Sequence, residues 1–248
     1  MASELSSSSY DPALSVAARR DRRRVYFVAK RYFDVLVAAI ALLALSPLIL
    51  LIAVLVKLDS PGPAIFTQKR VGLRRNGSSG DGAPWEVGTF DFHKFRTMKR
   101  DATPDMHRAY VEAFIRNDRE AMAAVQGADT QVRKILNDPR VTRLGAFLRK
   151  SSLDELPQFW SVLKGDMSLV GPRPALPYEV EAYQPWHRKR LEAIPGITGP
   201  WQVSARSSVD FDEMVKMDID YIEHQSFWLD LKILVQTPLA VLRSRGAV

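Results

Sequence analysis

The stretch VLVAAIALLALSPLILLIAVLV, residues 35–56, contains no charged side chain. At about 1.5 Å per residue, a helix of this length could cross a hydrocarbon core about 30 Å thick. Pro47 removes a backbone donor and clashes with the turn before it, so the helix should bend or break near Ser46. Each apolar arm would then be too short to span a bilayer alone.

Basic residues flank both ends of this apolar stretch. They are Arg19, Arg20, Arg22, Arg23, Arg24, Lys30 and Arg31 before it and Lys57, Lys69, Arg70, Arg74 and Arg75 after it. Positive flanks favour the cytoplasmic side of a membrane. Two cytoplasmic ends predict a re-entrant hairpin, in which the Ser46 hydroxyl satisfies a carbonyl freed by Pro47. The alternative is a single kinked span. The stretch is too long and starts too late for a cleaved signal peptide.

The composition is that of a globular domain joined to a membrane element. The chain has 248 residues, of which 46% are hydrophobic and 25% charged. We expect a disordered basic segment over residues 1–29, the membrane hairpin over 30–58 and a catalytic domain over 59–248. The basic residues at 19–24 suit anionic lipid, or they serve only as an orientation signal. The absence of cysteine excludes a thiolate nucleophile, and the net charge of +7 favours an anionic partner.

Beyond the membrane stretch the patterns are those of a mixed α/β domain. Residues 64–71 read as an extended segment, 76–84 as a Gly/Ser-rich loop, and 85–98 as a strand pair interrupted at Asp91. The interval 106–125 places one apolar stripe on a helix, which predicts core packing. Residues 221–242 predict either an amphipathic interfacial helix or a core helix.

The run SSLDELPQ, residues 151–158, is the candidate centre of the chemistry. Ser152 followed by Glu155 also fits a capping box, in which both side chains only satisfy free amides at a helix start. Basic residues surround the run: Arg143, Arg149 and Lys150 come just before it and Arg173 follows in Gly171-Pro172-Arg173-Pro174. An arginine held between two prolines has little backbone freedom, and its planar fork pairs with phosphate oxygens. A second Gly/Pro-rich turn, residues 195–201, leads to Arg206.

The adjacent carboxylates predict a division of labour. Neighbouring helix positions do not face each other, so Asp154 and Glu155 are not expected to share one proton. A carboxylate near a helix N-terminus stays ionised, and an ionised Asp154 could attack phosphorus to form an acyl-phosphate. Glu155 could then hold Mg²⁺, which takes one or two carboxylates together with substrate phosphates.

These motifs together resemble the bacterial sugar transferase family, the monotopic phosphoglycosyl transferases that begin the assembly of lipid-linked glycans. The resemblance runs from about Lys30 to about Leu242. It rests on the Ser46-Pro47 break, SPGPAIF at 60–66, QKRVG at 68–72, KFRTM at 94–98, SLDELPQ at 152–158, KGDMSLVGPRP at 164–174 and PGITG at 195–199.

The resemblance implies a membrane-embedded α/β enzyme with a re-entrant helix, amphipathic interfacial helices and a small catalytic domain on the cytoplasmic face of the bacterial inner membrane. Such enzymes transfer a sugar 1-phosphate from a UDP-sugar to polyprenyl (undecaprenyl) phosphate and release UMP. The implied roles are nucleophile for Asp154, Mg²⁺ ligand for Glu155, and phosphate binding for Lys94, Arg149, Arg173 and Arg206. Expected partners are the UDP-sugar, polyprenyl phosphate, membrane lipids and, as an option, a second copy of the chain.

Three departures from the family pattern bear on these expectations. Residues 99–134 form an insertion-like helical stretch that could serve specificity, oligomerisation or scaffolding. The chain has GPWQVS at 199–204 where many relatives carry Trp-Ala-Gln-Val-Asn. No further membrane helix precedes the apolar stretch, which predicts a short member.

Two other functional classes compete with the enzyme. One is a non-enzymatic membrane-anchored module that binds acidic partners through its basic surface. The other is a nucleic-acid binder, which we do not expect because the basic residues are not interleaved with aromatic ones in an RNA-binding motif.

Overall fold

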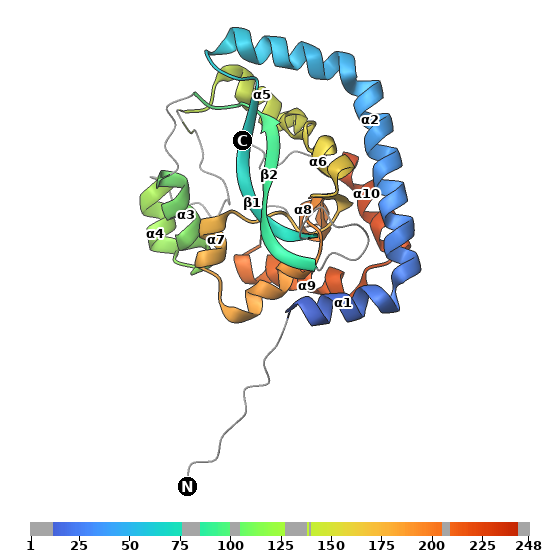
Figure 1. Ribbon diagram of the computed structural model, residues 1–248. Coiled ribbons are helices and arrows are strands. Elements are labelled where there is room, and N and C mark those ends of the chain that lie inside the picture. Colours follow the sequence, from blue (N-terminus) through green and yellow to red (C-terminus); the bar gives the residue numbers. More distant parts are fainter. Residues whose placement is uncertain are drawn as a thin grey trace.

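The computed structural model describes residues 12–75, 85–99, 105–126, 138, 140–204 and 209–242. Its dominant element is α2, Arg24–Asp59, one continuous helix that contains Pro47. Figure 1 shows α2 running up one side of the molecule and then bending across its top. The helix is therefore longer than the expected 30–58, and it bends without interruption.

Ser46 compensates for the proline as expected. Pro47 has no N–H to donate to the carbonyl four residues earlier, which belongs to Leu43. The Ser46 hydroxyl donates a 2.8 Å hydrogen bond to that carbonyl. A backbone acceptor that apolar surroundings could not satisfy is thus paired within the helix itself.

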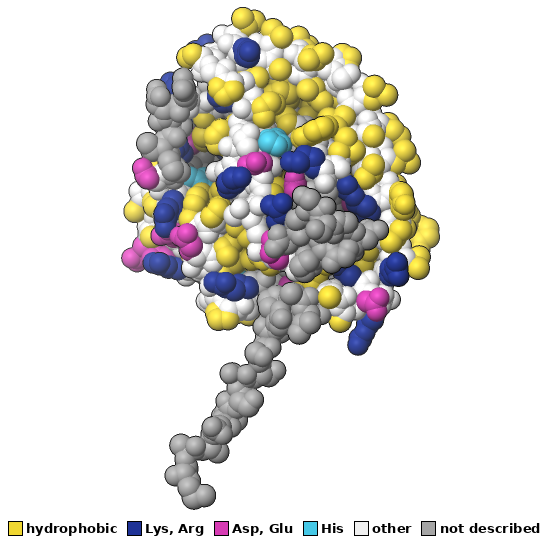
Figure 2. Space-filling view, viewed as in Figure 1, with side chains coloured by type: hydrophobic (Ala, Val, Ile, Leu, Met, Phe, Trp, Pro, Cys, Tyr) yellow, Lys and Arg dark blue, Asp and Glu magenta, His cyan; other side chains and the backbone are white. Residues whose placement is uncertain are grey.

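The outer face of α2 is apolar and largely uncovered. Leu43 is 78% exposed and Leu50 67%, and only 11% of the most apolar 18-residue window of the helix is buried. A core helix of a soluble protein would be covered, so this exposure favours a membrane anchor. In Figure 2 hydrophobic side chains line the side and top of the molecule, where α2 runs in Figure 1.

The N-terminal part of the chain differs from the expected disorder over residues 1–29. Residues 1–11 lie outside the described residues, but Pro12–Arg22 forms helix α1 and α2 begins at Arg24. Contacts with later parts of the chain account for the order. Arg19 pairs with Glu192 at 2.8 Å, and the Arg20 guanidinium lies 3.9 Å from the ring centroid of Trp85.

A long antiparallel hairpin follows α2. Strand β1, Ile65–Arg75, pairs along its whole length with β2, Trp85–Phe95. The expected strand pair within 85–98 is therefore wrong, because the partner of this strand is β1. Asp91 does not interrupt the strand, since it faces Lys69 across the ladder and forms a 2.9 Å ion pair with it. The loop expected at 76–84 lies outside the described residues.

A second, short sheet lies deeper in the domain. Strand β3, Ser168–Val170, pairs in parallel with β4, Gly196–Thr198. Gly196 was expected in a turn, but it is the first residue of β4. Within the described residues the fold is thus mixed helix and sheet, with two separate two-stranded sheets.

Helices surround these strands (Figure 1). They are α3 Asp105–Ile115, α4 Arg119–Gln126, α5 Arg143–Ser151, the 3₁₀ turn η2 Leu153–Glu155, α6 Gln158–Lys164, α7 Pro177–Glu181, the 3₁₀ helix η3 Pro185–Glu192, α8 Pro200–Ser204, α9 Phe211–His224 and α10 Phe227–Leu242. The stripe expected on one helix is divided between α3 and α4 by Asn117, which has a positive φ of 54°. Tyr110, Phe114 and Met122 do join the core as predicted.

The C-terminal interval 221–242 fits neither expectation completely. It belongs to two helices, because α9 ends at His224 and α10 begins at Phe227. On α10 Ile233 is buried, whereas Trp228 is 77% and Val235 69% exposed. The helix therefore packs one face on the core and leaves an apolar face uncovered.

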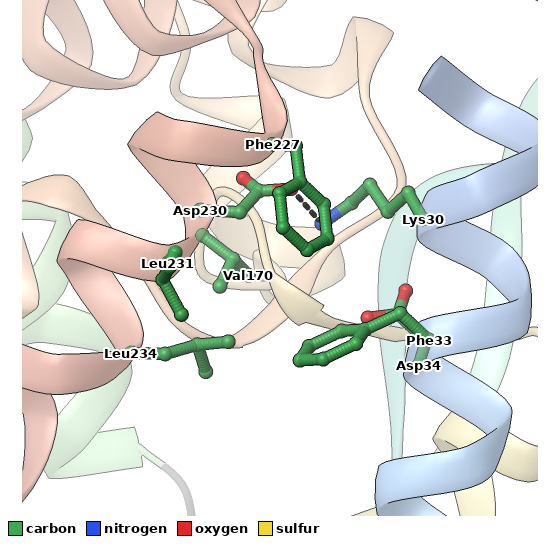
Figure 3. A pocket seen from close by; sticks show the side chains of 8 residues that line it. All are labelled: Lys30, Phe33, Asp34, Val170, Phe227, Asp230, Leu231 and Leu234. Atoms are coloured by element: carbon green, nitrogen blue, oxygen red, sulfur yellow. Dashed lines mark hydrogen bonds and ion pairs between the residues drawn. The ribbon is translucent and has the colours of Figure 1, made fainter. Parts of the chain in front are cut away.

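A buried polar group of side chains, the anchor cluster, joins α2 to this core. It consists of Tyr26, Lys30 and Asp34 from α2, Ser168 from β3, Tyr221 from α9 and Asp230 from α10. Lys30 Nζ lies 2.8 Å from Asp230 Oδ2, and the hydroxyls of Tyr26 and Tyr221 contact the same carboxylate at 2.8 and 2.6 Å. Figure 3 shows the Lys30–Asp230 pair beside a small cavity of about 10 Å³.

Candidate active site

The Asp154–Glu155 pair lies in η2, a tight turn between α5 and α6. Ser152 precedes it with a left-handed backbone, φ 57° and ψ 16°, and it both ends α5 and begins η2. Its side chain makes no capping bond, so the capping-box interpretation is wrong. The turn is closed instead by backbone bonds, from Glu155 N–H to the Ser152 carbonyl and from Leu156 N–H to the Leu153 carbonyl.

Apolar residues pack this turn against α2. Leu153 and Leu156 flank the carboxylates, and they pack in one cluster with Ile52 and Val56 of the second arm of α2. Phe95, at the end of β2, completes this contact and is fully buried. The acidic pair is thereby held beside the uncovered apolar surface of α2.

Arg173 meets the acidic pair from the other side. It lies in the loop that follows β3, and its Nη1 is 3.4 Å from Glu155 Oε1. The loop is held against β4 by two backbone bonds, from Gly171 N–H to the Thr198 carbonyl at 3.0 Å and from Gly196 N–H to the Pro172 carbonyl at 2.9 Å. A Cβ atom on Gly171 would overlap the Ile194 carbonyl, so this close approach requires glycine.

Lys94 brings a second cation to the site from β2. Burial, together with the positive charges of Arg70, Arg149 and Arg173, lowers the pKa of its ammonium group to about 8, and the negative charge of Asp154 acts in the opposite direction. Lys94 is thus within electrostatic range of Asp154, Arg149 and Arg173, so four of the predicted site residues lie in one region. Arg206 lies outside the described residues.

Asp154 itself is only 8% exposed. Buried carboxylates are costly unless positive or hydrogen-bonding groups compensate them, and the surrounding cations do so here. An ionised carboxylate in such surroundings can bind metal or attack an electrophilic phosphorus, while the cations stabilise phosphate oxygens.

Glu155 is the residue that could hold a metal ion. Among the described residues there is no group of three or more His, Asp or Glu side chains arranged around one point. Such a group is not needed for Mg²⁺, which keeps several waters and takes one or two carboxylates together with substrate phosphates. The partly exposed Glu155, beside Asp154 and facing Arg173, fits that requirement.

Arg70 lies near Lys94 and contacts the Arg173 loop, although it stood out in the sequence only as part of the basic flank of the apolar stretch and of the QKRVG motif. It projects from the middle of β1, is 9% exposed, and donates from Nη1 to the Pro174 carbonyl at 3.1 Å. The signal available in the sequence was its place within QKRVG, residues 68–72, in a segment with strand alternation. The sequence pattern could not predict that the strand paired with β1 carries Lys94.

A scan against protein families matches residues 25–244 to the model described as "Bacterial sugar transferase". The chain belongs to the bacterial sugar transferase family. The family match covers α2, the hairpin, the η2 turn and the Arg173 loop, so the elements that form the site lie within it.

Several curated relatives of this chain have names that agree with the family match. The chain is 41% identical over 223 residues to "Galactosyl transferase CpsE" of Streptococcus agalactiae and 40% identical over 218 residues to "Undecaprenyl-phosphate galactose phosphotransferase" of Salmonella typhimurium. It covers 44% and 41% of those two proteins, so it spans less than half of their length. It is also 41% identical to "Exopolysaccharide production protein ExoY" of Rhizobium meliloti and covers 88% of that protein, with 89% of its own residues aligned.

Proposed function

We propose that this transferase moves a sugar 1-phosphate from a UDP-sugar to polyprenyl phosphate at the cytoplasmic face of the bacterial inner membrane and releases UMP, as the first membrane step of exopolysaccharide or related glycan assembly. The observation that carries the proposal is the geometry of η2. It holds an acidic pair among Lys94, Arg149 and Arg173, directly on the apolar α2 helix. Relatives whose names specify galactose or glucose phosphate transfer to undecaprenyl phosphate support the same reaction.

In the first step Asp154 is the nucleophile. Its carboxylate oxygen forms a bond to the sugar-bearing phosphorus as the bond to the bridging oxygen breaks, and UMP leaves with that oxygen. In the second step a phosphate oxygen of the lipid attacks the same phosphorus. The Asp154–phosphorus bond breaks, and the product is a polyprenyl diphosphate sugar. The two displacements replace one transfer between two anions, which repel each other.

The basic side chains lower the barrier by neutralising the phosphate oxygens. Arg173 is held on a fixed loop, so it needs little reorganisation when charge develops in the transition state. Glu155 would hold Mg²⁺, which supplies further neutralisation of the diphosphate when it is bound. Replacing Glu155 by Gln should raise the Mg²⁺ concentration needed for half-maximal rate, whereas Glu181→Gln, on the exposed pair with Arg108, should leave it unchanged.

We further propose that α2 enters and leaves the membrane through one leaflet. Its bend, the Ser46 bond to Leu43 and the basic residues at both ends support this arrangement. Because the chain has no cysteine, single cysteines at the exposed positions Val25 and Leu58 would be unique labels. A re-entrant helix predicts that both react with a membrane-impermeant maleimide in inside-out vesicles only. Opposite accessibility of the two positions would instead establish a spanning helix.

The overall activity is tested by UMP release in a panel of UDP-sugars with undecaprenyl phosphate. The proposal predicts release with at least one UDP-sugar, dependent on the lipid for continued turnover, and loss of release in Asp154→Asn. Asp91→Asn is a matched control, since Asp91 pairs with Lys69 on the exposed face of the hairpin. A folded wild-type protein that turns over no UDP-sugar in the panel would contradict the proposal.

A further inference from the structure

Three arginines are buried among the described residues, and their charge partners differ. Arg190 pairs with the Asp218 carboxylate at 2.6 Å. Arg96 donates to the Val56 and Ser60 carbonyls at the C-terminal end of α2, where the helix dipole favours a cation. Arg70 has neither kind of partner.

The contacts of Arg70 are all with neutral groups. Nη1 donates to the Pro174 carbonyl at 3.1 Å, Nη2 donates to Gln68 Oε1 at 3.2 Å, and the guanidinium carbon lies 5.1 Å from the ring centroid of Phe92. No carboxylate of the described residues comes within ion-pair distance of it. The Nε atom has no acceptor, but this is equally true of Arg96 and Arg190, so the missing charge partner is what distinguishes Arg70.

The strand register places Arg70 on the same face of the hairpin as Lys94. Phe66 lies opposite Lys94, Gln68 opposite Phe92 and Arg70 opposite Phe90, and residues two apart along a strand share a face. The positive charge of Arg70 is the largest charge effect on Lys94. Its other neighbour is the loop that carries Arg173, which it contacts at Pro174.

A buried cation without a charge partner is costly, because it has lost its hydration. Through-space attraction from Glu179 and Glu155 offsets part of this cost, against repulsion from Arg173. Three cations, Arg70, Lys94 and Arg173, thus converge from β1, β2 and one loop. The weakly hydrated guanidinium suits such a buried role better than an ammonium group.

We infer that Arg70 is a further anion-site residue of this transferase, whose charge, held beneath Lys94 and the Arg173 loop, binds the diphosphate of the nucleotide sugar. The inference rests on the proposed function for the identity of the nucleotide, but the chemistry that it names is a diphosphate. It predicts that Arg70 contributes to ligand affinity while adding little to the stability of the unliganded fold.

The test is calorimetric titration of the full chain in lipid nanodiscs with UDP and, separately, with inorganic pyrophosphate. Arg70→Gln should weaken both ligands by about tenfold or more, as expected for loss of a charge-assisted contact. Arg70→Lys keeps the charge and should lose no more than about threefold. Arg74→Gln is a matched control on the same strand. Among the described residues Arg74 donates to the Thr89 carbonyl alone, and the variant should bind as wild type does.

Stability separates a binding role from a scaffolding role. The unfolding temperature of ligand-free Arg70→Gln should stay close to the wild-type value, because removal of an unpaired buried charge offsets the loss of two hydrogen bonds. The inference is overturned if Arg70→Gln binds both ligands like wild type. It is also overturned if the Gln and Lys variants weaken binding equally and both unfold at lower temperature. If the wild-type protein binds pyrophosphate but not UDP, the nucleotide part of the proposed function is refuted, and the pyrophosphate titrations still decide the role of Arg70. If the wild-type protein binds neither ligand, the proposed function and the role of Arg70 are both refuted.

Discussion

Two polar clusters lie against α2, and they differ in charge balance. In the anchor cluster each charged group has a direct partner, since Lys30 pairs with Asp230 and Asp34 accepts bonds from the Ser168 hydroxyl and the Leu169 N–H. At the η2 turn, Arg173 pairs with Glu155, and Lys94 feels the charges of Arg70, Arg149, Arg173 and Asp154, so four cations share one region with two carboxylates. A cluster that is satisfied by the protein alone holds the fold, whereas a cluster with surplus positive charge is arranged for an anion that arrives from outside.

The largest effect should come from removing the nucleophile at the unbalanced cluster. Asp154→Asn keeps the size of the side chain but has no ionised oxygen to attack phosphorus, so UMP release should fall by about a thousandfold or more. The measurement is the initial rate of UMP release, with Asp91→Asn assayed alongside. If Asp154→Asn kept more than a tenth of the wild-type rate, the assignment of the nucleophile would be wrong.

A smaller effect, on stability rather than on chemistry, should come from breaking the anchor cluster. Lys30→Met leaves the buried Asp230 carboxylate without its cation, which should cost about 3–5 kcal/mol of unfolding free energy. Replacing both partners, Lys30→Met with Asp230→Leu, should recover much of that loss, because no buried charge is then left unpaired. Chemical unfolding in detergent measures both variants. Equal stability of the single variant and the wild type would show that the cluster does not hold α2.

The pH dependence of ligand binding should give the smallest effect. Because the pKa of Lys94 is lowered to about 8, its charge, and with it a share of the attraction for phosphate, is present below pH 8 and lost as pH rises above it. The dissociation constant of UDP should therefore rise several-fold between pH 7 and pH 9.5, which corresponds to the loss of about one charge-assisted contact. Lys94→Arg should flatten this profile, because a guanidinium stays charged throughout.

Lys94 also makes a prediction for the ligand-free fold. The unfolded chain keeps the proton of this lysine up to its ordinary pKa of 10.5, while the folded chain releases it near 8. The unfolded state thus binds more protons between these values, so the contribution of Lys94 to stability should rise with pH across this window. Comparison of wild type with Lys94→Met by chemical unfolding at pH 7 and pH 10 isolates that contribution. A contribution that falls over the same interval would contradict the burial of a charged Lys94 among cations.

The sequence predicted local features more reliably than pairings. The Ser46–Pro47 compensation and the core positions Tyr110, Phe114 and Met122 follow from helix geometry, which depends on neighbours in the chain. The pairing of β2 with β1 and the parallel pairing of Gly196 with Ser168 depend on residues far apart in sequence. Hydrophobic periodicity does not identify the partner of a strand. For this reason Asp91 was interpreted as an interruption and Gly196 as part of a turn.

The same distinction applies to the site. The motifs predicted Asp154, Glu155, Lys94, Arg149 and Arg173, and the structure brings all five together. Ser152 was misread because a Ser-x-x-Glu spacing fits both a capping box and a left-handed helix end, and only the backbone distinguishes them. Arg70 was not singled out, because its proposed role follows from the lack of a carboxylate partner. Only the three-dimensional packing shows that lack.

The central claim, covalent transfer through Asp154, is tested most directly by intact-protein mass spectrometry after incubation with a UDP-sugar and Mg²⁺ in the absence of lipid. The account predicts one added sugar phosphate, located on the peptide that contains Asp154, and its discharge when polyprenyl phosphate is added. A protein that releases UMP with the lipid present, yet never carries the adduct when rapidly quenched, would show direct transfer between the two substrates and contradict the account.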